Sequence, residues 1–192
     1  AAVVTAAVAS GRLDRRASQA VFRVLLDTLA RPGQLRRLPI SSIGPGVVAL
    51  ALAGVDTSFA VVGDNGCQER IGLATGARVV PLDEAPLVGL YGQTTPDTLR
   101  RLRRGSALAP EDGAKVGVAC RRLHEGPAEV TVRLFGPGVA GQAVVGFGGL
   151  APELFTTLAE VNRGFPAGID VWFVDDTDAV MGIPRSVHQE VI

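Results

Sequence analysis

Apolar and polar positions follow a helical period in some stretches of this 192-residue chain and an extended pattern in others. In the range 13–31, apolar residues recur at helical spacing, and Arg31-Pro32-Gly33 is typical of the end of a helix. The same reasoning, together with start and stop residues, predicts further helices over 47–53, 65–75, 95–104 and 151–163.

Extended patterns separate these helices. Strands are predicted over 34–40, 58–62, 78–81, 87–91, 114–121, 128–135, 140–147, 169–174 and 179–183. In 128–135, apolar residues occupy alternate positions, which predicts a strand with one wet face. Helices and runs of strands are mixed along the chain, so we expect an α/β fold with a mixed β-sheet flanked by helices. The length suits a single domain over 1–192, and we expect residues 1–12 to be poorly ordered.

Charge and hydropathy narrow the function classes. Basic and acidic residues balance at 19 each, whereas a protein that holds phosphate backbones usually has a basic surplus, so no nucleic-acid partner is expected. The chain has no uncharged apolar window long enough to predict a membrane span. Its apolar start lacks the basic region of a signal peptide. We therefore expect a cytoplasmic protein that does not bind membranes.

Two groups of residues could ligate metal but are better explained structurally. Cys67 and Cys120 stand far apart in apolar stretches, which favours two buried thiols. Asp175, Asp176 and Asp178 could hold a hard cation, but a tight turn between two strands is favoured because Asp is common there. No metal site is expected.

Two further segments suggest anion binding only weakly. The basic run 100–104 could meet an acidic partner surface, although a solvated helix face is the better interpretation. The glycine-rich stretch 146–149 precedes a helix but matches no phosphate-binding loop, so a flexible turn is favoured.

Arg185 and His188 form the candidate site. They lie three residues apart in a short segment that Pro184 stiffens. An Arg and a His so placed could grip a ligand that carries a phosphate, and they could equally order a subunit interface. The residues themselves leave this choice open.

Four segments resemble, in order and spacing, the H subunit of the carbon–phosphorus lyase core complex. They are FRVLL at 22–26 running into RPG at 31–33, GSALAPEDGA at 105–114, FPAGID at 165–170 and IPRSVH at 183–188. The last two are the more specific, and the resemblance runs from near the N-terminus to the end of the chain.

The resemblance implies a role in phosphonate catabolism. The family joins the G, I and J subunits in a core complex and forms homodimers when isolated. With an ATP-binding-cassette-like protein, the complex forms ribose 1-alkylphosphonate 5-triphosphate from ATP and an alkylphosphonate, ahead of cleavage of the carbon–phosphorus bond. The implied fold is similar to that of pyridoxal-phosphate-dependent transferases without the cofactor. Lys115, the single lysine, starts a predicted strand in no evident cofactor pocket, so no cofactor is expected.

The residues that match the family signature carry no assigned catalytic role. They are Arg23, Pro32, Gly33, Pro110, Glu111, Gly168, Asp170, Pro184, Arg185 and His188. Asp170 and Arg185 lie on or beside the last two predicted strands and could form a buried pair. The favoured hypothesis is a structural, partner-binding subunit. The alternative is a small-molecule-binding or catalytic subunit in which Arg185 and His188 hold a phosphonate or a nucleotide phosphate, and whether the chain is itself an enzyme stays open.

Overall fold

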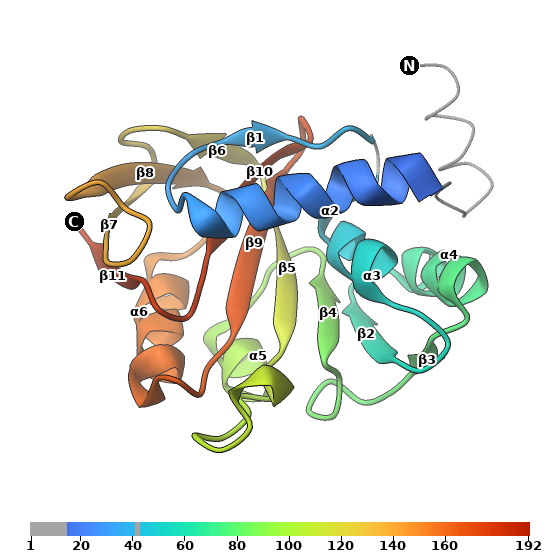
Figure 1. The fold of residues 1–192 in the computed structure, drawn as a ribbon. Helices are drawn as coiled ribbons and strands as arrows, with labels where there is room; N and C mark the ends of the chain where they lie inside the picture. The colour runs from blue at the N-terminus through green and yellow to red at the C-terminus, as the bar shows by residue number, and fades with distance from the viewer. Residues whose placement is uncertain (1–14, 41–42) are drawn as a thin grey trace.

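The computed structural model describes residues 15–40 and 43–192, so the expectation of poor order for 1–12 lies outside the described residues. A seven-stranded sheet forms the centre of the fold, in the order β1-β10-β9-β5-β4-β2-β3 (Figure 1). Its strands are β1 (Arg36–Arg37), β2 (Ser58–Val62), β3 (Arg78–Val79), β4 (Leu87–Leu90), β5 (Lys115–Cys120), β9 (Asp170–Asp175) and β10 (Ala179–Ile183). β10 pairs antiparallel with both β1 and β9, and the other pairs are parallel, so the expected mixed sheet is confirmed.

A second, antiparallel sheet lies beside the first, in the order β11-β7-β8-β6. Its strands are β6 (Arg122–His124), β7 (Val130–Phe135), β8 (Ala143–Gly148) and β11 (His188–Val191). Side chains of β7 are buried at alternate positions, which confirms the expected pattern. The sequence did not predict β6 and β11, because their short segments, RLH and HQEV, are mostly polar and lack a run of strand-forming residues.

Helices cover both faces of the central sheet. They are α2 (Arg15–Ala30), α3 (Val47–Leu52), α4 (Asn65–Thr75), α5 (Pro96–Arg100) and α6 (Pro152–Val161), with short 3₁₀ turns η1 (Gly44–Gly46), η2 (Pro110–Asp112) and η3 (Asn162–Gly164). Figure 1 shows α2 lying across one face of the sheet, with α3 on the same side. The core on that face is built from α2, α3 and α4, and the core on the other face from α5, α6 and the second sheet.

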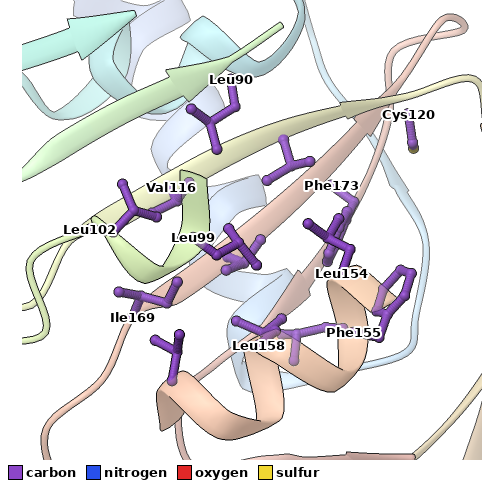
Figure 2. Close-up of a cluster of buried hydrophobic side chains, with 14 of the residues drawn as sticks. Leu90, Leu99, Leu102, Val116, Cys120, Leu154, Phe155, Leu158, Ile169 and Phe173 are labelled. Carbon is purple, nitrogen blue, oxygen red and sulfur yellow. The ribbon is translucent and has the colours of Figure 1, made fainter. Parts of the chain in front are cut away.

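The second core joins three elements through aromatic rings. Phe147 of β8, Phe155 of α6 and Phe173 of β9 pack with ring centroids 4.5 to 5.5 Å apart. Figure 2 shows Leu154 and Leu158 of α6 in the same cluster of buried side chains. The second sheet is therefore fixed to the central sheet through α6, which brings β11 close to this helix.

Several predicted elements are shorter than expected, two of them by the widest margin. The helix predicted over 95–104 ends at Arg100, because the carbonyls of Arg103 and Arg104 accept hydrogen bonds from Ala114 and Gly168, at 2.8 and 2.7 Å. The basic run 100–104 therefore lies mostly beyond the helix, so its interpretation as a helix face is wrong. The strand predicted over 34–40 is reduced to Arg36–Arg37, since Pro39 has no amide hydrogen for a sheet.

Candidate functional site

The segment that carries Arg185 and His188 links the two sheets. β10 of the central sheet ends at Ile183, where Pro184 offers no amide hydrogen to continue it. The chain then turns, with the amide of Val187 donating to the carbonyl of Pro184 at 3.0 Å. It enters β11 of the second sheet at His188. Both predicted residues thus lie at the junction of the sheets.

Arg185 is bound within the protein. Its guanidinium donates to both carboxylate oxygens of Asp170, at 3.2 and 2.8 Å, and to the carbonyl of Pro110. The amide of Arg185 also donates to Asp170, at 2.9 Å. The side chains of this pair are only 11% and 17% exposed. The pair that the sequence suggested is present, and it commits the fork of Arg185 to holding η2 against β9.

His188 lies apart from that pair, on the exposed side of β11. Its imidazole stacks on the ring of Phe135 in the neighbouring strand β7, with centroids 5.3 Å apart and an interplanar angle of 23°. Arg185 and His188 therefore line the same region, but Arg185 faces its internal partners while His188 is open to solvent.

A cleft of about 610 Å³ opens at this junction. Its walls combine aromatic, aliphatic and amide groups with cations, and are formed by Phe135, Pro137, Ala159, Asn162, Arg163, Phe165, Arg185, Ser186, Val187, His188 and Gln189. Sequence reasoning missed Asn162, Arg163 and Gln189 because nothing in their local pattern separates them from ordinary helix-end and strand residues.

Comparison with known proteins identifies the family. The family described as bacterial phosphonate metabolism protein (PhnH) matches residues 13–190. The chain belongs to the PhnH family. It is 30% identical over 186 residues to the alpha-D-ribose 1-methylphosphonate 5-triphosphate synthase subunit PhnH of Rhizobium meliloti, covering 90% of each chain. It is also 27% identical over 172 residues to the putative C-P lyase subunit protein HtxG of Stutzerimonas stutzeri, covering 88% of this chain and 84% of that one.

Most of the residues that we expect to match the family signature gather in two places. Pro110, Gly168, Asp170, Pro184 and Arg185 meet at the amino edge of the central sheet, where β9 begins. Gly168 has φ +152°, and a Cβ there would lie 2.5 Å from Oδ1 of Asn162. That oxygen accepts from the amide of Ile169 at 2.8 Å. Glycine is therefore required at this turn by geometry.

The second group closes the end of α2 in this PhnH chain. Pro32 and Gly33 are buried, and Gly33 has φ +88°. A Cβ on Gly33 would approach Ala143 of β8 to 2.9 Å, so the turn packs directly on the second sheet. Arg23 and Glu111 are exposed, and their side chains belong to neither group.

Lys115 does not fit a pyridoxal site. It is the first residue of β5, at the amino ends of the parallel strands, and its Nζ donates to the carbonyl of Glu111 at 3.5 Å. Ligands of open α/β sheets bind at the opposite, carboxyl ends of the strands. Lys115, the only lysine of the chain, is therefore best explained by a structural role.

The carboxyl ends hold a smaller cleft, of about 250 Å³, that contains Asp64, Arg70 and Tyr91. The hydroxyl of Tyr91 donates to the carbonyl of Ile43, accepts from the amide of Gly46 at 3.0 Å and lies 2.8 Å from the sulfur of Cys67. Burial, followed by the contact with Cys67, raises the pKa of Tyr91, so the phenol stays protonated.

The cysteines and aspartates behave as the structural interpretation predicts. Cys67 and Cys120 are buried, and burial raises the pKa of both thiols. In the turn between β9 and β10, Asp175 accepts from the amides of Thr177, Ala179 and Leu123, at 2.8, 3.1 and 3.0 Å. Burial alone would raise the pKa of Asp175, but these bonds and one from the Thr177 hydroxyl lower it. Asp175 therefore stabilises the turn between β9 and β10.

Proposed function

We propose that this chain is a subunit of the bacterial carbon–phosphorus lyase core complex. In this role it takes part in forming ribose 1-alkylphosphonate 5-triphosphate from ATP and an alkylphosphonate, ahead of carbon–phosphorus bond cleavage. Membership of the PhnH family supports the proposal, as do the names of the two relatives, one a synthase subunit and the other a putative lyase subunit.

Within the complex, the chain binds partners. The observation that carries this role is the outer side of α2, the longest helix of the described residues. Phe22 and Leu26 lie one turn apart there and are 41% and 49% exposed, while Val21 and Leu25 bury the inner side. A helix that is apolar on two sides needs cover on both, and exposed apolar patches mark interaction surfaces.

The partners we propose are the G, I and J subunits, with a second copy of the chain as partner when it is isolated. We place this assembly in the cytoplasm. No helix within residues 15–40 and 43–192 has both the length and the apolar character needed to cross a membrane.

The fold is proposed to be related to that of pyridoxal-phosphate-dependent transferases. A seven-stranded mixed sheet with helices on both faces supports this relation. The position of Lys115 at the amino ends of the strands favours a scaffold that uses the fold without its cofactor. Determining the crystal structure and superposing it on such transferases tests the relation; a different order of strands would exclude it.

Co-expression with the G, I and J subunits tests the partner-binding role. The native chain is expected to elute with them in size-exclusion chromatography. The double change Phe22→Glu and Leu26→Glu should release it from the assembly, because two charges replace the apolar stripe of α2. Leu73→Glu is the control, since Leu73 is an exposed leucine on α4, away from this stripe. Co-elution of the double variant at native levels would exclude α2 as the docking surface, and separate elution of the native chain would reject the proposed function.

A further inference from the structure

The cleft between α6 and β11 has an unsatisfied amide in its wall. Gln189 of β11 lines this cleft and is 9% exposed. Its Oε1 and Nε2 are both buried, and neither has a hydrogen-bond partner among the described residues. Buried polar side chains are nearly always paired, and leaving both a donor and an acceptor unpaired lowers stability. A group that enters the cleft and supplies both partners would remove this cost.

The arginines around Gln189 favour an anion. The lining contains Arg163 and Arg185, and no Asp or Glu is among the described residues that form it. Arg185 is occupied by Asp170 and Pro110. Arg163, on η3, is exposed and makes no ion pair within residues 15–40 and 43–192, so its five donors are available to a phosphate.

Aromatic rings complete the cleft. Phe165 is 61% exposed, and the ring of Phe135 on β7 stacks with the imidazole of His188 on the neighbouring strand β11. Exposed aromatic faces beside a cation are suited to a flat heterocycle, because base–aromatic stacking is favourable for any base. The cleft therefore has a flat wall and a cation in one place, with the amide of Gln189 buried behind its lining.

We propose that this cleft binds a nucleoside phosphate. The base stacks on the aromatic wall, and its adjacent donor and acceptor pair with the Gln189 amide, as a glutamine pairs with adenine. Because both amide atoms are buried, the base reaches them through a rotation of the Gln189 side chain into the cleft. The phosphate binds Arg163. A volume of about 610 Å³ lies within the range of small-molecule sites. This site is independent of the docking surface on α2.

Isothermal titration calorimetry on the full chain tests the proposal with AMP, adenosine, ribose 5-phosphate and inorganic phosphate. AMP is expected to bind more tightly than each fragment. Gln189→Leu should weaken AMP roughly tenfold or more, and so should Arg163→Gln, because each removes a paired contact. Arg163→Gln should leave adenosine unaffected. Gln93→Leu and Arg101→Gln are the matched controls, since both residues are exposed outside the cleft.

Thermal denaturation tells whether the amide of Gln189 serves ligand binding or the stability of the fold. Gln189→Leu is expected to keep or raise the Tm, because it replaces an unpaired buried amide with an apolar group of similar size. A lower Tm would show that the amide has an internal partner and would overturn the proposal. Absence of AMP binding, binding of inorganic phosphate as tight as that of AMP, or an unchanged AMP affinity in both variants would overturn it too. Gln189→Leu should still co-elute with the G, I and J subunits. Loss of AMP binding with co-elution retained would therefore concern this site alone and would leave the proposed function standing.

Discussion

Two clefts of this protein differ in how some of their polar groups are satisfied. At the carboxyl ends of the parallel strands, where α/β sheets usually bind ligands, the Tyr91 hydroxyl and the Asp175 carboxylate are fully engaged with their own chain. At the junction of the two sheets, Gln189 is buried without a partner among the described residues, and Arg163 and Phe165 are open to solvent. Two polar groups at the usual ligand position are therefore engaged by internal bonds, whereas the junction that β11 creates has a buried amide and an exposed cation without partners among the described residues.

The largest effect is expected from removing the ion pair between Asp170 and Arg185 at the junction cleft. Asp170→Ala leaves the buried guanidinium of Arg185 without its carboxylate, so we expect a loss of about 3–5 kcal/mol in the free energy of unfolding, measured with urea. Glu190→Gln is the control, because it breaks the exposed pair with Arg133 and should cost about 1 kcal/mol or less. Equal losses would mean that Asp170 and Arg185 are not a buried pair in solution.

A smaller loss is expected at the turn that precedes β9. Gly168→Ala places a Cβ against Oδ1 of Asn162 in a backbone conformation that favours glycine, and should cost about 3 kcal/mol. Gly164→Ala has open space around the new Cβ and should change stability by about 0.5 kcal/mol or less. Thermal and urea unfolding measure both variants. If Gly168→Ala is as stable as Gly164→Ala, the junction is less rigid than the contacts imply.

The cleft at the carboxyl ends of the strands gives the next effect. Tyr91→Phe removes the hydroxyl that serves Ile43 and Gly46, and should destabilise the chain by about 2 kcal/mol, because buried backbone groups lose their partner. Thr98→Ala removes an exposed hydroxyl and is expected to cost less than about 1 kcal/mol. AMP affinity should be unchanged in Tyr91→Phe; a loss of affinity there would place the ligand at the carboxyl ends instead.

The smallest effect appears only in acid. The folded pKa of Asp175 is lowered below the unfolded value of about 3.9, so its contribution is present above that pH and is lost as the pH falls through the folded pKa. Unfolding free energies measured from about pH 6 down to about pH 3 should therefore fall less steeply in Asp175→Asn than in the native chain. Parallel curves would show that the turn bonds do not favour the ionised form.

The sequence predicted elements best where a local signal was complete. The helix over 65–75 matches its observed bounds, since Gly76, with φ +71°, ends it as predicted; the structure adds Asp64 as its N-cap. The strands over 58–62 and 179–183 also match. The helix over 95–104 was predicted too long, because its end depends on hydrogen bonds from Ala114 and Gly168, which are distant in sequence. Local pattern carries no information on such bonds.

The candidate site was predicted in part. The sequence predicted a site at Arg185 and His188 because the two residues lie three positions apart. It also suggested the pair of Arg185 with Asp170, which the structure contains. Gln189 was missed, because an unpaired amide is defined only by what surrounds it. Arg163 was missed for the same reason, since only the packing of α6 against β11 brings the end of that helix to the cleft.

The sequence by itself determined the α/β class, most of the helices and strands of the central sheet, and the family. These follow from periodicity, capping residues and motifs, which are local properties of the chain. Tertiary structure alone decided that β6, β7, β8 and β11 form a separate sheet, that Arg185 turns inward and that Gln189 is left unpaired. The reason is physical: hydrogen-bond satisfaction and burial depend on residues far apart in sequence, and only the packed chain brings them together.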